Sequence, residues 1–187
     1  FFFHPPPPTP DPLWSRGLGD VYKRQNPVLI AKELLDEFPV MLAGEGAIEF
    51  ALKKGYKQTK VKGSEKGWTG DTVGAVTQSS EGNIVVASST GGVRGRPVGR
   101  VGDTPLWGSG FYCDEKVGIV ATGVGEAITE QLLCYKVAQH SENLEEAMKW
   151  GVRLLPKDTG VGVIGINNNG QIYGSSNTSM PFSIIER

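Results

Sequence analysis

The sequence has little of the side-chain chemistry on which many hydrolases depend. Its 187 residues include two cysteines and two histidines. Cys113 and Cys134 stand in no CxxC or other metal-ligand spacing and can form at most one disulfide, which favours a reducing, cytoplasmic setting. His4 lies in a proline-rich stretch, and His140 ends a predicted helix, where a cation stabilises the helix dipole. A histidine-dependent nucleophile and a metal site are both poorly supported, and we expect no cofactor.

Strong charge of one sign and long hydrophobic runs are missing as well. A formal net charge of −1 and an isoelectric point near 6.2 give no positive field that would attract nucleic acid or an anionic membrane. No apolar run approaches the roughly 18 residues that span a bilayer. With 39% hydrophobic residues, the chain is long enough for one substantial core. We therefore expect a soluble protein without nucleic-acid or membrane partners.

The first 25 residues show neither helix nor strand periodicity. They combine an aromatic triplet, a proline run and a basic end, FFFHPPPPTPDPLWSRGLGDVYKRQ, in an order that differs from a secretory signal. A disordered tail and a translated artefact fused to a truncated gene both explain this composition. We interpret residues 1–25 as a non-native or disordered leader and leave them out of the fold prediction.

Residues 26–71 predict two helices followed by a linker. NPVLIAKELLDEFP has apolar residues at helical spacing after Pro27, and AIEFALKKGY predicts a second helix that ends at Gly55. Between the two helices, Val40-Met41-Leu42 predicts a brief strand. The polar, glycine-rich stretch up to residue 71 predicts an exposed linker that suits a cleavage site.

After residue 71 the apolar pattern takes a period of two, which is typical of strands. TVGAVTQ and IVVASST, joined by a turn over residues 79–83, predict a β-hairpin. KVGIVATG predicts a buried strand, EAITEQLLCYKVAQH one long helix and ENLEEAMKWGVRLL another, and GVGVIGIN and QIYGSSN a second hairpin. Residues 160–165 match G-x-G-x-x-G, but a turn and a strand follow instead of a helix, so we expect no nucleotide site there. The hairpins argue for antiparallel sheets covered by helices, an α+β fold.

Thr72 stands where the glycine-rich linker meets a strand, in the stretch GDTVGAV. A threonine at a chain terminus can use its own α-amine, with a pKa of about 7.7–8.0, as the base for its hydroxyl. Thr72 reaches that state only if the bond after Asp71 breaks. On local sequence alone, an ordinary threonine at a strand start is the simpler interpretation.

Four motifs, in order and spacing, change that interpretation: DTVGAV, SSTGG over residues 88–92, GRVGD over residues 99–103 and TGVGE over residues 122–126. They resemble the start of the β-subunit in the family of plant-type asparaginases, isoaspartyl peptidases and glycosylasparaginases, and the segment from residue 26 resembles the end of its α-subunit. The resemblance implies an amino-terminal nucleophile hydrolase with a four-layer αββα sandwich. Residues 26–71 would be the end of the α-subunit with the processing linker, and residues 72–187 the β-subunit.

The resemblance also implies roles for single residues. Cleavage between Asp71 and Thr72 would make Thr72 nucleophile and base, with Thr90 orienting its hydroxyl. Arg100 would bind the substrate's α-carboxylate and Asp103 its α-ammonium. The plainer explanations are a strand-end threonine for Thr90 and an exposed, weak ion pair for Arg100 and Asp103.

Three residues of the TGVGE motif complete the implied site. Thr122 and Gly123 would stabilise the oxyanion, and Gly125 would let the substrate approach the backbone closely. A glycine-rich turn between a strand and a helix explains the same residues without a function.

The implied activity is hydrolysis of a small molecule, the side-chain amide of L-asparagine or a β-aspartyl dipeptide, by a homo-oligomer of processed αβ units. N4-(β-N-acetylglucosaminyl)-L-asparaginase activity is the alternative within the family. An inactive truncated fragment or non-catalytic homologue is the alternative of another class, because we expect the family's strands before residue 26 to be absent or replaced and the C-terminus to be clipped.

Overall fold

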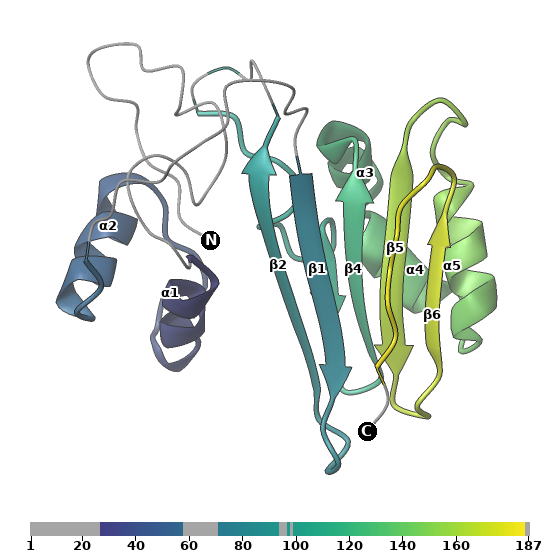
Figure 1. Cartoon of the computed structure of the whole chain (residues 1–187), viewed down its shortest axis with the longest axis horizontal. Helices are drawn as coiled ribbons and strands as arrows, with labels where there is room; N and C mark the ends of the chain where they lie inside the picture. Colours follow the sequence, from purple (N-terminus) through teal and green to yellow (C-terminus); the bar gives the residue numbers. More distant parts are fainter. Residues whose placement is uncertain (1–26, 58–70, 94–96, 98, 186–187) are drawn as a thin grey trace. The chain divides into compact units, whose positions relative to one another are not determined.

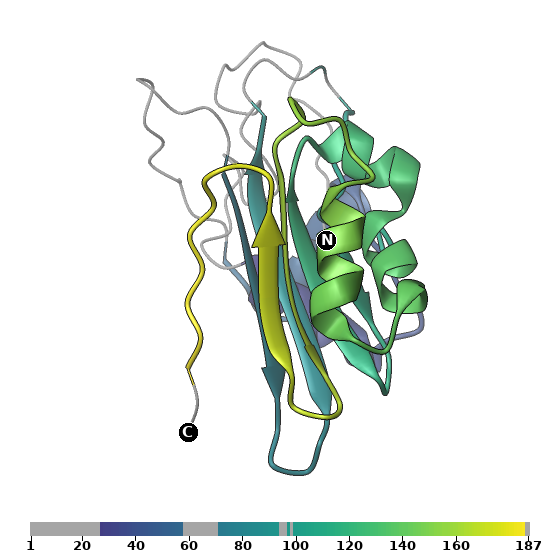
Figure 2. The same cartoon turned by 90° about the vertical axis from the view of Figure 1, so that its right-hand side faces the viewer.

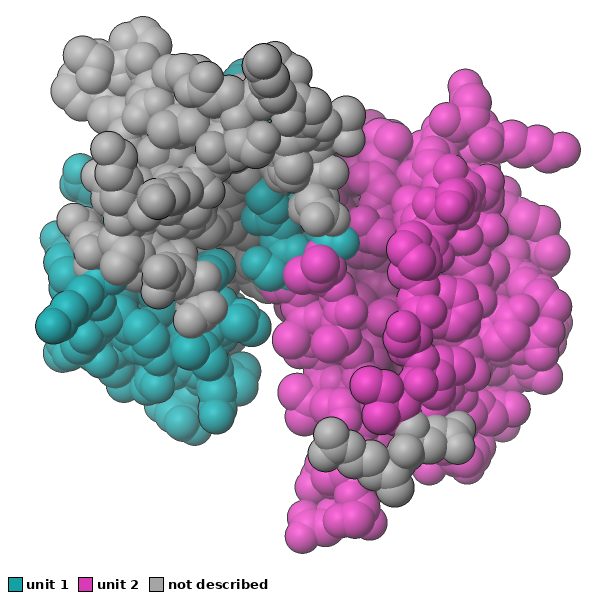
Figure 3. Space-filling model, viewed as in Figure 1, with its two compact units in different colours: residues 1–72, 89–101 teal, residues 73–88, 102–187 magenta. Residues whose placement is uncertain are grey.

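The computed structural model describes residues 27–57, 71–93, 97 and 99–185. The chain divides into two compact units, which Figure 3 colours separately: unit 1 holds residues 1–72 and 89–101, and unit 2 holds residues 73–88 and 102–187. The predicted leader and nearly all of the predicted linker lie outside the described residues.

Unit 1 contains helix α1 (Pro27–Glu33), the short 3-10 helix η2 (Leu34–Asp36) and helix α2 (Gly44–Lys53), so both predicted helices are present. The Tyr56 hydroxyl donates to a Glu33 carboxylate oxygen at 3.2 Å and ties the chain after α2 back to α1. The predicted strand at residues 40–42 is wrong: these residues pair with no strand among the described residues, and the Val40 side chain is 98% exposed. A short apolar run forms a strand only when another strand is there to pair with it.

Unit 2 is built on a four-stranded antiparallel sheet in the order β3-β4-β5-β6 (Figure 1). The strands are β3 (Phe111–Cys113), β4 (Val117–Gly123), β5 (Val161–Asn167) and β6 (Ile172–Ser176). In the central pair, Ile119 lies opposite Gly165 and Gly123 opposite Val161. The G-x-G-x-x-G stretch thus enters a strand and a hairpin, as expected, and opens no helix. Sequence reasoning missed β3, because three residues are too few to show a period of two.

Helices α3 (Gly125–Gln131), α4 (Leu133–His140) and α5 (Leu144–Val152) cover one face of this sheet (Figure 2). Their apolar sides bury Ile128, Val137 and Met148 against strand residues such as Ile119 and Val161.

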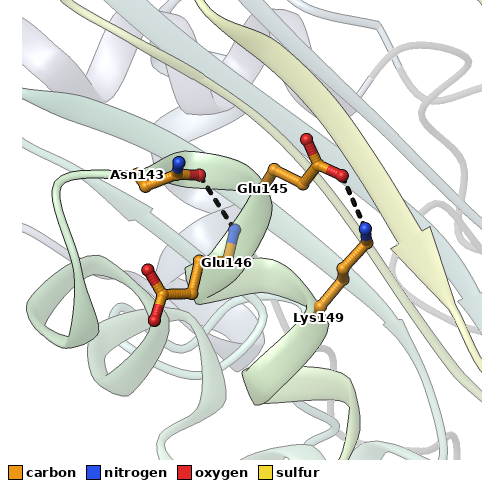
Figure 4. Close-up of polar contacts among 4 residues, drawn as sticks. All are labelled: Asn143, Glu145, Glu146 and Lys149. Atoms are coloured by element: carbon orange, nitrogen blue, oxygen red, sulfur yellow. Dashed lines mark hydrogen bonds and ion pairs between the residues drawn. The ribbon is translucent and has the colours of Figure 1, made fainter.

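Helix α5 begins with a side-chain cap. The Asn143 carboxamide oxygen accepts from the Glu146 N–H at 3.0 Å, and Lys149 pairs with Glu145 one turn apart (Figure 4). The cap satisfies one of the N–H groups that a helix start leaves unpaired.

The single long helix predicted over residues 126–140 is wrong, because the chain breaks into α3 and α4 at Leu132. Leu132 has a left-handed backbone, with φ 49°. The two N–H groups that follow in the first turn of α4 donate to a neighbouring loop: Tyr135 to the Gly108 carbonyl at 2.8 Å and Cys134 to the Ser109 carbonyl at 3.4 Å. These tertiary hydrogen bonds replace the intrahelical partners that a continuous helix would have supplied.

The hairpin of β1 (Asp71–Gln78) and β2 (Ile84–Gly92) turns at Ser79, whose N–H donates to the Asn83 carbonyl at 2.9 Å. Within unit 2, this hairpin packs on the sheet face opposite the helices. A Cβ built on Gly118 would lie 2.6 Å from Ile84 and 2.9 Å from Val86. Unit 2 therefore stacks helices, a four-stranded sheet and a hairpin sheet, three consecutive layers of the expected sandwich. The predicted α+β class is confirmed.

Candidate active site

Thr72 and Thr90 face each other across the hairpin of β1 and β2. Ser79 pairs with Asn83 at the turn, and seven residues along each strand from that pair are Thr72 and Thr90. The Thr72 hydroxyl donates to the Thr90 hydroxyl oxygen over 3.0 Å, and the same oxygen accepts from the Gly92 N–H at 2.9 Å. The structure thus brings two of the sequence-predicted site residues into direct contact.

This contact has a chemical use and a structural one. A half-buried hydroxyl with a fixed hydrogen-bond partner is oriented for attack, whereas hydrogen-bonded threonine pairs also stabilise hairpins without any catalytic role. Asp71 precedes Thr72 in the same strand. Cleavage between them stays a prediction, as does the α-amine base that cleavage would create.

Thr122 and Gly123 end β4, on the central pair of the sheet. Gly123 has φ +148°, and a Cβ built on it would lie 2.2 Å from the Gly160 carbonyl oxygen, so no side chain fits at this position. Thr122 is half-buried, on the sheet face that also carries Val120 and the hairpin. Sequence reasoning missed the role of Gly160 here, because it treated that residue only as the first glycine of a G-x-G-x-x-G pattern.

The direction of the Gly123 N–H follows from the ladder between β4 and β5. Along an antiparallel ladder, hydrogen-bonded and non-hydrogen-bonded residue pairs alternate. The Val124 N–H donates to the Gly160 carbonyl at 3.1 Å, so Val124 and Gly160 form a hydrogen-bonded pair, and the next pair, Gly123 with Val161, is a non-hydrogen-bonded one. The Gly123 N–H therefore points away from β5. On that side, the last ladder bond from the β3 segment reaches only Ala121, whose N–H donates to the Gly110 carbonyl at 2.8 Å. Within the described residues, the sheet thus gives the Gly123 N–H no ladder partner, and Gly123 is an exposed residue.

Gly125 is the first residue of α3 and is buried. Its carbonyl accepts from the Thr129 hydroxyl at 2.8 Å, one turn along the helix. The turn between β4 and α3 is therefore formed by residues with defined backbone partners, and its chemistry at the substrate stays a prediction.

Arg100 and Asp103, the two predicted charged contacts, belong to different units, and each is described within its own. Arg100 is half-buried in unit 1, and its N–H donates to the Pro97 carbonyl at 3.2 Å. Asp103 is 6% exposed in unit 2, where its carbonyl accepts from the Leu106 N–H at 2.8 Å. Both residues make further interactions. Such burial does not fit the plainer explanation of Asp103 as part of a surface pair.

The two cysteines are poor candidates for a nucleophile. Burial raises the pKa of the Cys134 thiol well above its ordinary value, and the negative charge of Asp103 raises it further. Burial likewise raises the pKa of the half-buried Cys113, with a contribution from Asp114. Because only the thiolate attacks readily, these shifts make both cysteines weaker nucleophiles than an ordinary thiol.

His140 lies in the last turn of α4, as predicted, and its ring stacks on Trp150 with 3.9 Å between the ring centroids. In the part of the chain that the structure describes, no three histidine, cysteine or carboxylate side chains gather as metal ligands would. Among the same residues, no helix is long and apolar enough to cross a membrane.

Comparison with known proteins gives a consistent family. A family model described as "Asparaginase" matches residues 56–186. The N(4)-(Beta-N-acetylglucosaminyl)-L-asparaginase of Elizabethkingia miricola is 30% identical over 81% of this chain and 54% of its own length. The isoaspartyl peptidase/L-asparaginase of Xenopus laevis is 34% identical, over 84% of this chain and 60% of its own length. The plant-type L-asparaginase of Pyrobaculum calidifontis is 34% identical, over 78% of this chain and 58% of its own length. The chain thus spans between half and two thirds of the length of these relatives.

Proposed function

This chain belongs to the asparaginase family, and on that premise we propose that Thr72 is the nucleophile of a self-processing amidohydrolase. The substrates are L-asparagine, β-aspartyl dipeptides or both. The hydrogen bond of 3.0 Å between the Thr72 and Thr90 hydroxyls is the observation that carries the proposal, because it fixes the attacking oxygen on a paired strand. A threonine nucleophile also accounts for a chain whose two cysteines are held neutral.

Self-processing makes the base. The Thr72 hydroxyl oxygen attacks the carbonyl carbon of Asp71, the peptide C–N bond breaks, and the Thr72 nitrogen takes the hydroxyl proton. Water then hydrolyses the resulting ester, which leaves a carboxylate on Asp71 and a free α-amine beside the hydroxyl of Thr72. That amine has a pKa near neutrality, about 7.7–8.0, so it can accept the hydroxyl proton in the next reaction.

Hydrolysis of the substrate repeats the attack. Oγ of Thr72 adds to the side-chain amide carbon, and the carbonyl oxygen becomes an oxyanion. The Gly123 N–H and the Thr122 hydroxyl donate to that oxyanion, while Gly125 leaves room for the substrate. Collapse expels ammonia or an amine with the transferred proton, and water cleaves the acyl-enzyme to release aspartate. The Gly123 N–H supports this role because the sheet leaves it outside the ladder.

In this proposal, Arg100 and Asp103 bind the two charged groups at the amino-acid end of the substrate. Arg100 pairs with the α-carboxylate and Asp103 with the α-ammonium, since a guanidinium and a carboxylate are the natural partners of those groups. Only compounds with both groups free then react well. The processed αβ units assemble as a homo-oligomer, and the two free cysteines support a reducing, cytoplasmic setting.

Glycosylasparaginase activity is the second candidate. It is favoured by the 30% identity to the Elizabethkingia miricola protein, which extends over 81% of this chain. Its substrate carries the same free α-groups and differs in the leaving group alone.

Intact-mass spectrometry and a substrate panel test the proposal on the full chain. We expect two fragments, one of which starts at Thr72, and a single uncut chain for Thr72→Ala. L-asparagine or a β-aspartyl dipeptide should be hydrolysed far faster than N-acetyl-asparagine amide, which lacks both charges. A wild-type chain that stays uncut and hydrolyses none of these compounds would overturn the proposal and favour a non-catalytic homologue. Comparable turnover of the blocked compound would refute the roles of Arg100 and Asp103.

A further inference from the structure

Asn177, directly after β6, binds the start of β5 with both its side chain and its backbone. Its carboxamide oxygen accepts from the Val161 N–H at 2.8 Å, and its carboxamide nitrogen donates to the Thr159 carbonyl at 2.8 Å. Its own N–H donates to the Val161 carbonyl at 3.1 Å. The Asn177 side chain therefore continues the ladder beyond Ser176, where β6 ends.

The peptide held between these two contacts is that of Gly160. Gly160 has no side chain to hold it in place, so its neighbours on either side, Thr159 and Val161, set its backbone. Because successive carbonyls of a strand point to opposite sides, a clamp that holds Thr159 and Val161 toward β6 turns the Gly160 carbonyl toward β4.

The Gly160 carbonyl meets the loop of the proposed oxyanion donors. It accepts from the Val124 N–H at 3.1 Å and lies against Gly123, where a Cβ would come within 2.2 Å of it. The hydrogen bond from Val124 fixes the last residue pair between β4 and β5. It thereby also fixes that the N–H of the preceding residue, Gly123, points away from β5.

We propose that Asn177 is a positioning residue for the Gly123 N–H: its carboxamide holds the backbone around Gly160, and the Gly160 carbonyl binds the Val124 N–H and packs against Gly123, which keeps Gly123 in the backbone conformation that turns its own N–H away from β5. This inference rests on the proposed function, since it gives Asn177 a part in catalysis only if Gly123 stabilises the oxyanion. In this proposal Asn177 acts through the backbone of Gly160 and not on the reacting atoms. Its effect is confined to the transition state, where an oxyanion donor must be aligned within a fraction of an ångström.

A matched control lies at the opposite end of the same strand. The Asn167 carboxamide donates to Gln171 at 2.7 Å and accepts from the N–H groups of Asn169 and Gln171 at 3.1 and 3.0 Å. Asn167→Ala thus removes three side-chain hydrogen bonds at the far end of β5 from the Gly123 loop, whereas Asn177→Ala removes two near that loop. Asn177→Asp keeps an acceptor for Val161 but loses the donor to Thr159.

The test combines amide hydrogen exchange with steady-state kinetics on full chains, with rates divided by the processed fraction measured by mass. In Asn177→Ala we expect the Val124 amide to exchange at least about tenfold faster than in the wild type, because its acceptor is no longer held. With a β-aspartyl dipeptide, kcat should fall about tenfold to a hundredfold while KM changes less than about threefold, because the lost alignment matters only in the transition state. Asn177→Asp should fall between the wild type and the alanine variant in kcat. Asn167→Ala should keep the wild-type kcat and Val124 exchange even if its midpoint of unfolding falls.

The outcomes separate this inference from the proposed function. Unchanged Val124 exchange and unchanged kcat in Asn177→Ala would overturn the positioning role. Equal losses of kcat in Asn177→Ala and Asn167→Ala would overturn it too, since general destabilisation would then explain both. If the wild type hydrolyses nothing, the proposed function fails, and the Val124 exchange rate alone decides whether Asn177 holds the loop.

Discussion

Replacing Thr90 with valine removes one hydroxyl and keeps the branched shape of the side chain. In the structure that oxygen accepts from the Thr72 hydroxyl at 3.0 Å and from the Gly92 N–H at 2.9 Å. Thr90→Val therefore frees the proposed nucleophile to rotate and takes an acceptor from a buried backbone N–H. The change should affect both the rate of hydrolysis and the stability of the fold, by different amounts.

The magnitudes follow from these two contacts. An unpaired buried N–H costs about 1–3 kcal/mol, and a lost neutral hydrogen bond about 0.5–1.5 kcal/mol. Because Thr90 is half-buried, water replaces part of both contacts, and we expect the free energy of unfolding to fall by about 1–2 kcal/mol. Loss of a fixed attack direction should lower kcat about tenfold to a hundredfold, which is about 1.4–2.7 kcal/mol of activation free energy.

Urea unfolding and steady-state kinetics with a β-aspartyl dipeptide measure the two effects. Thr90→Ser keeps the oxygen and should retain kcat within about threefold, since the hydrogen bond survives. Thr77→Val, at an exposed position of β1, makes the same change on the same hairpin and should leave kcat unaltered. A Thr90→Val enzyme with wild-type kcat would refute the orienting role of Thr90, whatever happens to its stability.

Three further substitutions test single positions, two in unit 2 and one in helix α2 of unit 1. The Asp114 carboxylate accepts from two backbone N–H groups of its turn and from the Tyr112 hydroxyl; burial alone would raise its pKa, but these hydrogen bonds hold the pKa below its ordinary value. Because Asp114 is exposed, water screens part of this stabilisation, so Asp114→Asn should cost at most about 1 kcal/mol of unfolding free energy at neutral pH, and the cost should shrink as pH falls below about 4 and through the lowered pKa of the folded state; a cost that stays constant with pH contradicts this. Gly118→Ala would place a methyl group 2.6 Å from Ile84 and should cost about 1–3 kcal/mol in a urea titration. A Gly118→Ala chain as stable as the wild type would contradict the packing of the hairpin on the sheet. Gly46 lies inside α2, and a Cβ built on it meets no atom within 4 Å, so Gly46→Ala should stabilise that helix by up to about 1 kcal/mol.

The elements that sequence reasoning predicted well have local causes. The turn over residues 79–83 sets the register of its hairpin, and the turn after Asn167 does the same for β5 and β6, because short loops allow few strand pairings. The predicted strand at residues 40–42 failed because no described segment pairs with it. The predicted helix over residues 126–140 failed at Leu132, where loop carbonyls take the N–H groups that the helix would have used.

Some features of the candidate site also have local causes in the sequence, and others arise only from tertiary packing. The family resemblance implied that Thr90 contacts Thr72, and the structure explains the contact by register, since the two residues stand at equal distances from the turn of one hairpin. The roles assigned to Arg100 and Asp103 came from the family resemblance and stay predictions. No local pattern indicates the burial of Asp103, which results from the packing of unit 2 around the residue.

The sequence by itself therefore determined which residues face each other within one hairpin, because that pairing is set by contacts over a short stretch of chain, while the chemistry assigned to those residues stays a prediction from the family resemblance. Only the tertiary structure decided the direction of the Gly123 N–H, the contact of Gly123 with Gly160 and the clamp of Asn177 behind them. Gly123 meets groups that lie nearly 40 residues away along the chain, and which side of β4 its N–H faces depends on how two separate strands align. A pattern within a single segment contains no information about that alignment, since it arises only when the sheet is assembled.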